Sequence, residues 1–253
     1  VDYETGNWCE GLTAYMADHL IQEQRGRGEE YRRDTLQKYR SYVREGRDFP
    51  LTEFRSRHSA ATEAVGYGKT MMVFHMLRQR LGDEAFRKWA ARFYREYRGK
   101  QATFADVRRS LEAVAGQDLG RFFADHVEKP GAARLQASLS DLRESVNGGS
   151  EISFVIEQKQ PGPSLQLDVP VVVQTLGKPV TTTVRLEGGL VAHTVRTEAE
   201  PVALHVDPSF DVFRLLDPRE TPPSIGQIFG EPRILAVLPS KASAAEQEAW
   251  RQL

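Results

Sequence analysis

The spacing of apolar residues changes once along this chain of 253 residues, near residue 138, and this change constrains the fold more than any other feature. Before it, apolar side chains recur every three or four residues, which places them on one face of an α-helix. After it, short runs rich in β-branched residues are separated by proline, glycine and asparagine. The sequence therefore predicts an α+β protein of more than one domain, with helices first and strands second.

Residues 1–137 are predicted to form an all-helical domain. The expected helices cover residues 9–24, 31–45, 67–80, 84–97, 103–114 and 118–127. Gly26 and Gly28 break the pattern after the first helix, because glycine is unfavourable inside helices. Thr103, followed three residues later by Asp106, predicts a capped helix start.

Residues 138–218 are predicted to form a small antiparallel β-sandwich. Its expected strands are 152–156, 165–169, 171–175, 180–186, 192–197 and 203–206. They recur at intervals of about 8–12 residues, which is typical of sandwiches. Residues 219–253 are predicted to be a linker and the start of a further strand–helix element, with the strand at 233–239 and the helix from Ala244.

Charge and hydropathy exclude two classes of partner. The net charge is −1, and the basic residues that gather before residue 135 are interleaved with acidic ones. A nucleic-acid-binding protein would show a basic balance and interleaved surface aromatics, so we expect no nucleic-acid partner. No run approaches the ~18 apolar residues of a membrane span, so we expect no transmembrane segment.

One candidate site residue is Glu10, within the segment Gly6–Tyr15, which reads Gly-Asn-Trp-Cys-Glu-Gly-Leu-Thr-Ala-Tyr. Glu10 falls in the first turn of a predicted helix, where the helix dipole alone stabilises a carboxylate by about 0.3–1 kcal/mol. A carboxylate on a rigid helix next to a small residue is also suited to be a zinc ligand. The residues alone favour a glutamate that only stabilises the helix start, and they leave the role of zinc ligand open. Cys9, the residue before Glu10, is the only cysteine, so the chain cannot form an intrachain disulfide. We expect Cys9 to be a buried packing residue.

The second candidate is Tyr67, in the segment Gly66–Thr70 that precedes the apolar run 71–77. From the residues alone it is a core tyrosine at a helix start. The Gly-Lys-Thr ending of this segment is not a phosphate loop. The first glycine of that motif would be at position 63, which is Glu63, and no buried strand precedes it.

Taken together, these two segments resemble the family of zinc aminopeptidases related to membrane alanyl aminopeptidase and leukotriene A4 hydrolase. In that family a segment with a tryptophan, a Glu-Gly pair, an alanine and a tyrosine carries the third zinc ligand, and a later Tyr-x-Lys-Gly segment carries a catalytic tyrosine. The resemblance implies that Glu10 is a zinc ligand and that Tyr67 is catalytic. It covers about residues 6–135, and three positions depart from the family pattern: Cys9, Ala17 and Thr70.

The resemblance also implies the fold, the cofactor and the substrate. It predicts the all-helical half of a thermolysin-like catalytic lobe, followed by the sandwich. The full protein would hydrolyse peptide bonds, most simply at an N-terminal residue, with zinc-activated water. The two zinc histidines and the general base lie upstream in that family, in a His-Glu-x-x-His motif that these 253 residues lack. We therefore expect the partner of this chain to be the upstream catalytic half of the same protein, and the chain alone to be inactive.

Two further observations bear on this expectation. The chain starts at Val1 rather than at a methionine and stops within a predicted helix, as a fragment would. None of the six histidines has the four-residue helical spacing of a zinc motif to another histidine; His19 and His75 are expected in the core or at its rim, and His58 could approach the site. The alternative function is a non-catalytic interaction module derived from a peptidase, which the three departures leave open.

Overall fold

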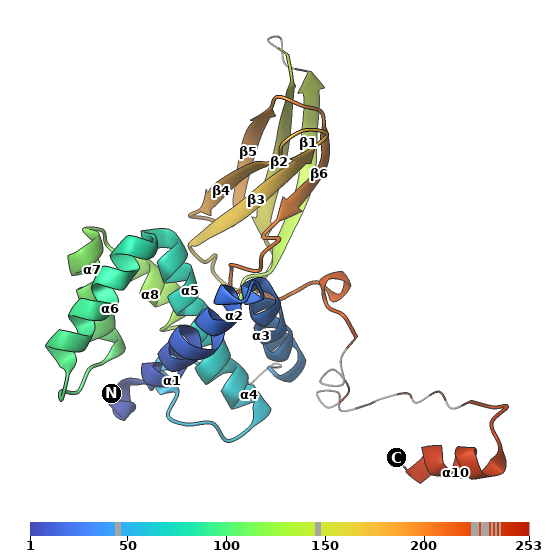
Figure 1. Cartoon of the computed structure of the whole chain (residues 1–253), viewed down its shortest axis with the longest axis horizontal. Coiled ribbons are helices and arrows are strands. Elements are labelled where there is room, and N and C mark those ends of the chain that lie inside the picture. Colours follow the sequence, from blue (N-terminus) through green and yellow to red (C-terminus); the bar gives the residue numbers. More distant parts are fainter. Residues whose placement is uncertain are drawn as a thin grey trace. The chain divides into compact units, whose positions relative to one another are not determined.

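A computed structural model describes residues 1–43, 47–144, 148–223, 228, 233, 235, 237 and 239–252 of the chain. The chain divides into two compact units, Val1–Pro222 and Pro223–Leu253. The first unit contains helices followed by antiparallel strands, which confirms the predicted α+β class (Figure 1). The predicted domain limits at 137/138 and 218/219 stay a prediction.

The helical part of the first unit is built around one long buried helix. The helices are α1 (Trp8–Thr13), η2 (Ala14–His19), α2 (Leu20–Gln24), α3 (Gly28–Tyr42), α4 (Ala60–Glu63), η4 (Ala64–Lys69), α5 (Thr70–Leu81), α6 (Asp83–Tyr97), α7 (Phe104–Ala115) and α8 (Gly120–His126). Short 3-10 turns are η1 (Tyr3–Thr5), η3 (Leu51–Glu53) and η5 (Pro218–Glu220). Both η2 and η4 are π-helical, so α1–η2–α2 and α4–η4–α5 each form one continuous helix with a π-helical centre.

The helix expected to begin at Tyr67 begins seven residues earlier, at Ala60. Ser59 is its N-cap and accepts a hydrogen bond from the backbone of Thr62, whose side chain in turn bonds to the N-cap backbone. The prediction was wrong at this end because Gly66 and Gly68 resemble helix breakers, whereas here they lie inside a π-helical stretch. The capping box of Thr103 and Asp106 is confirmed at the start of α7.

Six strands form two three-stranded antiparallel sheets. They are β1 (Leu135–Glu144), β2 (Ser150–Gln158), β3 (Leu167–Thr175), β4 (Val180–Leu186), β5 (Leu190–Thr197) and β6 (Pro201–Val206). The sheet orders are β1-β2-β5 and β4-β3-β6 (Figure 1). Burial alternates along β2 and β3, and the buried residues of both strands belong to one apolar core. This is the pattern of two sheets packed face to face.

Two expectations about the strands were wrong. The runs 165–169 and 171–175 are not separate strands, because β3 continues through Pro170. Pro170 has no backbone N–H, and this is tolerated because the ladder with β6 begins one residue later, at Val171. Strand β1 was missed because its mixed polar sequence, Leu-Gln-Ala-Ser-Leu-Ser-Asp-Leu-Arg-Glu, lies at an exposed sheet edge and carries little apolar alternation.

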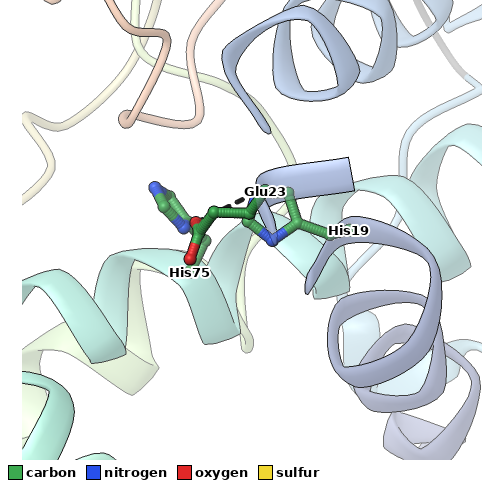
Figure 2. Close-up of side chains that lie close together, drawn as sticks. All are labelled: His19, Glu23 and His75. Atoms are coloured by element: carbon green, nitrogen blue, oxygen red, sulfur yellow. Dashed lines mark ion pairs between the residues drawn. The ribbon is translucent and has the colours of Figure 1, made fainter. Parts of the chain in front are cut away.

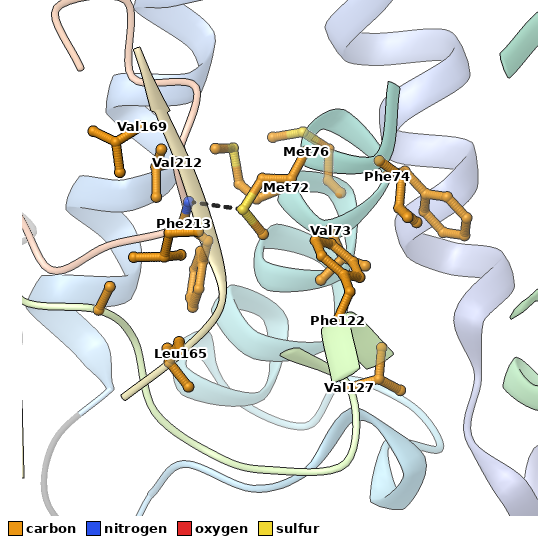
Figure 3. Close-up of a cluster of buried hydrophobic side chains, with 14 of the residues drawn as sticks. Met72, Val73, Phe74, Met76, Phe122, Val127, Leu165, Val169, Val212 and Phe213 are labelled. Atoms are coloured by element: carbon orange, nitrogen blue, oxygen red, sulfur yellow. Dashed lines mark hydrogen bonds between the residues drawn. The ribbon is translucent and has the colours of Figure 1, made fainter. Parts of the chain in front are cut away.

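After β6 the chain returns to the helices through residues 207–222, which we call the strap. Its apolar side chains Val212 and Phe213 pack against the buried face of α5, together with Leu165 from the segment before β3 (Figure 3). The backbone N–H of Phe213 donates a hydrogen bond of 3.4 Å to the sulfur of Met76. The helical part and the sandwich therefore share one apolar core across the strap.

Three side chains of α3 hold the strap by its backbone carbonyls. Arg32 donates from Nε and Nη2 to the carbonyl of Ser209 at 3.1 and 2.9 Å. Gln37 donates to the carbonyl of Pro222 at 2.9 Å, and Arg40 donates to that of Leu216. Residues of α3 also line the cavity described below. These hydrogen bonds to the strap therefore help to hold α3, and its cavity residues, in place.

In the second unit the expected helix is confirmed as α10 (Ala244–Gln252). The strand predicted at 233–239 falls partly on Ile234, Ala236 and Leu238, which lie outside the described residues. The described residues between them, Leu235 and Val237, are exposed and belong to no strand. Within the described residues, no helix has the length and apolar character that crossing a membrane requires.

His126 generates a prediction about the pH dependence of folding. It is buried at the end of α8, its Nε2 bonds to the carbonyl of Gln166 at 2.9 Å, and burial lowers its pKa to about 4. The unfolded chain, with a histidine pKa near 6.5, therefore binds more protons than the folded chain between pH 4 and 6.5, so the stability from this group is lost as pH falls through that window. At pH 5 the loss is about 2 kcal/mol, from 1.36 kcal/mol per pH unit.

We expect His126→Gln, which keeps a hydrogen-bond donor but does not titrate, to flatten the fall in urea midpoint between pH 7 and 5. The exposed His205→Gln is the matched control and should leave the slope unchanged. A slope that His126→Gln leaves unchanged would contradict the prediction.

Candidate active site around Glu10 and Tyr67

The structure brings the two sequence-predicted site residues together, although they are 57 positions apart. Glu10 is half-buried in the first turn of α1, and Tyr67 is half-buried in η4. The pKa of Tyr67 is raised, first by burial and then by its hydroxyl's contact with the carboxylate of Glu10. A tyrosine with a raised pKa stays protonated near neutral pH and keeps its O–H as a donor.

Two glycines allow this approach. A Cβ on Gly11 would lie 2.2 Å from the Cβ of Thr70, and a Cβ on Gly66 would lie 2.1 Å from the ring of Phe54. Both distances are far below van der Waals contact, so a larger residue at either position would push the helices apart. Gly11 therefore lets α1 meet α5, and Gly66 seats η4 on the loop that precedes α4.

The residues before Glu10 anchor the start of α1. Trp8 is buried and donates from its indole N–H to the carbonyl of Ala102 at 2.9 Å. The side-chain amide of Asn7 donates to the carbonyl of Arg55 at 3.0 Å. The tryptophan of the motif thus has a structural role here, because it fixes the helix end that carries the carboxylate.

Arg57 is a site residue that sequence reasoning missed. Its guanidinium lies 5.6 Å from the centre of the Tyr67 ring and pairs with Glu63 at 3.0 Å. Phe54 packs edge-on against the same ring, with 5.9 Å between centroids. The positive charge of Arg57 opposes the effect of Glu10 on the pKa of Tyr67. No spacing pattern marks this arginine, which lies in the loop before α4.

A cavity of about 400 Å³ opens beside Tyr67. Small residues, Ala14, Ala64 and Gly68, are among its lining residues, and Tyr31 and Thr35 line it from α3. Charged side chains, Asp18, Lys38, Arg57 and Glu63, are also among its lining residues. A cavity of this volume has room for a side chain of a bound molecule next to Tyr67.

Other sequence expectations near this site have mixed outcomes. Cys9 is exposed, so its predicted burial was wrong; the one-residue offset from buried Trp8 turns it away from the core. His58 is exposed and contacts Ser56, and it is not among the residues that line the cavity. His19 and His75 are fully buried, as expected for core residues.

These two histidines form a second cluster with Glu23, which sequence reasoning missed (Figure 2). One donor atom from each of the three lies within 4.8 Å of the others, and two imidazoles with a carboxylate are a ligand set that zinc uses. The four-residue step from His19 to Glu23 along one helix was the available sequence signal.

Arginine side chains already supply the positive charge in this cluster. Arg32 donates to Nε2 of His19 at 2.9 Å and lies 3.7 Å from Glu23, while Arg78 pairs with Glu23 at 2.6 Å. His75 and Arg32 both contact the strap carboxylate Asp211, at 2.8 and 3.1 Å. Burial, followed by the charges of His75 and Arg32, lowers the pKa of His19 to about 3. A cation would have to displace a guanidinium here, so we interpret the cluster as a salt-bridged polar core.

The fit of zinc to the site at Glu10 is partial. Glu10 presents one carboxylate on an anchored helix end. Among the residues that the structure describes, Glu10 belongs to no group of three close histidine, cysteine or carboxylate donors. The described chain therefore supplies one ligand of such a site and not a complete set.

No family model matches the sequence. Leucyl aminopeptidase from Saccharolobus solfataricus is 26% identical over 117 residues, covering 46% of this chain and 14% of that protein. Aminopeptidase N from Lactococcus lactis subsp. lactis is 31% identical over 78 residues, covering 31% of this chain and 9% of that protein. The chain thus matches only a small part of the length of these curated relatives.

The crystal structure of Legionella pneumophila aminopeptidase A in complex with aspartic acid has a similar fold, with a TM-score of 0.55. The match covers 90% of this chain and 27% of that one, at 16% identity, which shows a likeness of fold alone. The chain is therefore similar to aminopeptidases in part of its sequence and in its fold.

Proposed function

We propose that the chain is the downstream part of the catalytic region of a zinc-dependent peptidase, most simply an aminopeptidase of the membrane alanyl aminopeptidase type. The observation that carries this proposal is the contact between Glu10 and Tyr67, the second of which also lines a cavity. The similarity to aminopeptidases supports a peptide as substrate. The helical part would be half of a thermolysin-like lobe.

In this proposal Glu10 is the carboxylate ligand of zinc, and the two histidine ligands and the general base come from an upstream segment. The anchored start of α1 suits that role, because a ligand on a fixed helix end needs little reorganisation. Zinc, when bound, polarises the peptide carbonyl and lowers the pKa of its water toward about 7.

Tyr67 would donate a hydrogen bond to the oxygen on which negative charge develops during peptide hydrolysis. A tyrosine is protonated at neutral pH, and the raised pKa of Tyr67 leaves it so, so the phenol stabilises that charge without adding one of its own. Phe54 and Arg57 hold the ring from two sides and would fix the direction of the O–H.

The first prediction from this proposal concerns the isolated chain. We expect the purified 253 residues to show no turnover of aminoacyl-amide substrates, because one carboxylate cannot hold catalytic zinc. The longer protein that contains the chain should be active, should lose activity with a chelator and should regain it with zinc. A longer protein that is folded, takes up no zinc and cleaves no substrate would instead support the non-catalytic interaction module.

The second prediction is that Tyr67→Phe in the longer protein lowers kcat by about 10²–10³, with a small effect on KM, because the lost hydrogen bond forms mainly in the transition state. Tyr94→Phe, at an exposed position of α6, is the matched control and should leave kcat unchanged. Wild-type kcat in Tyr67→Phe would show that the phenol has no catalytic role.

The third prediction concerns Glu10→Gln in the longer protein. Loss of a direct ligand should weaken zinc binding by more than the roughly 10–100-fold that an outer partner costs. Metal content after dialysis against a chelator measures this without an activity assay. Glu29→Gln, in the first turn of α3, is the matched helix-start control and should retain the wild-type zinc content.

A further inference from the structure

Lys69 is a buried charge at the end of η4, the π-helical stretch that also carries Tyr67. Lys69 is only 1% exposed, and its Nζ donates a hydrogen bond of 2.9 Å to the backbone carbonyl of Lys129. The same Nζ lies 5.7 Å from the centre of the ring of Phe213, which belongs to the strap. One side chain of η4 therefore reaches both the strap and the segment that follows α8.

Burying this amine is unfavourable for folding. Burial lowers the pKa of Lys69 to about 8, although the carboxylate of Asp48 opposes that shift. A neutral side chain of similar length, such as methionine, would fill the same space without a charge to bury. What the amine adds to packing is a directed hydrogen bond and a cation above an aromatic ring.

The carbonyl that accepts this hydrogen bond is itself held in place. The side chain of Lys129 pairs with the buried carboxylate of Asp125 in α8 at 3.1 Å. Two residues further on, Gly131 donates its backbone N–H to the carboxylate of Asp48. Lys69 therefore bonds to a segment that is tied to the rest of the fold on both sides of the acceptor.

The position of Lys69 relative to Tyr67 suits it to orient the phenol. Side chains two residues apart project to nearly opposite sides of a helix, because each residue turns the helix by about 100°. Tyr67 is flanked by Gly66 and Gly68, and the other two residues of η4 besides Lys69 are apolar. Lys69 is therefore the one other residue of η4 whose side chain can hold the helix by a directed bond.

We propose that Lys69 is a positioning residue for Tyr67: its bond to the carbonyl of Lys129 fixes the rotation of η4 and so directs the tyrosine hydroxyl to Glu10. The inference rests on the proposed function for the catalytic role of Tyr67, and it names the residue that orients the phenol. A catalytic group displaced by about 1 Å can lose roughly 10²-fold in rate, so the direction of the phenol needs a fixed support.

The test is whether the contact between Tyr67 and Glu10 depends on Lys69. It is measured at pH 7 in the purified chain, from the NMR chemical shift of the ring carbon that carries the Tyr67 hydroxyl. In the wild-type chain we expect Glu10→Gln to move this resonance, because the hydroxyl contacts the carboxylate. In a Lys69→Met chain we expect Glu10→Gln to leave the resonance where it is, because coupling between two groups disappears when they no longer touch.

Matched variants separate positioning from stability. Lys88→Met, at an exposed position of α6, is the control and should keep the wild-type response to Glu10→Gln. Lys69→Gln is a second test variant, since its amide is too short to reach the same carbonyl, and it should also abolish the response. If Lys69 served only to stabilise the fold, both Lys69 variants would shift the urea midpoint and keep the response. A folded Lys69 variant with the wild-type response would overturn the proposal.

The NMR response needs neither zinc nor turnover, so the two proposals fail separately. In the longer protein, Lys69→Met should lower kcat by roughly 10²-fold with little change in KM. If the longer protein hydrolyses peptides and Lys69→Met keeps the wild-type response and kcat, the positioning role is wrong and the peptidase proposal stands. If the response depends on Lys69 but the longer protein takes up no zinc, the peptidase proposal is wrong and Lys69 still orients Tyr67.

Discussion

The close contact between α1 and α5 at Gly11 and Thr70 sets the geometry on which the candidate site depends. With a hydrogen as its side chain, Gly11 leaves the space that the β-branched Thr70 fills. The two continuous helices that meet there carry Glu10 and Tyr67, so the distance between these two residues depends on this contact. A glycine and a threonine in mutual contact also explain why Thr70 is compatible with the site although it departs from the family pattern.

A second constraint is the buried polar core that joins the helices to the strap. Asp211 of the strap contacts both His75 and Arg32, and Arg32 also reaches His19. Removing one partner from such a cluster would leave a charge or a donor buried without compensation, which is strongly unfavourable. The polar core thus specifies how α3 packs, and α3 in turn supplies the wall of the cavity beside Tyr67.

The site could be predicted only in part from the sequence. Glu10 and Tyr67 could be named as candidates because each lies in a recognisable local segment. Asp18, Tyr31 and Arg57 were not, because two helices and the loop before α4 bring them to one cavity only in the folded chain. The extension of one helix back to Ala60 was missed because glycines inside a π-helical stretch look like breakers.

The sequence by itself determined the order of helices and strands, the capped start of α7 and the antiparallel character of the second half. These features follow from periodicity and capping, which act over a few neighbouring residues. Only the tertiary structure decided that Glu10 contacts Tyr67, that Cys9 faces outward and that Asp18 and Tyr67 line one cavity. The physical reason is that these relations depend on close packing between remote segments, which no local pattern encodes.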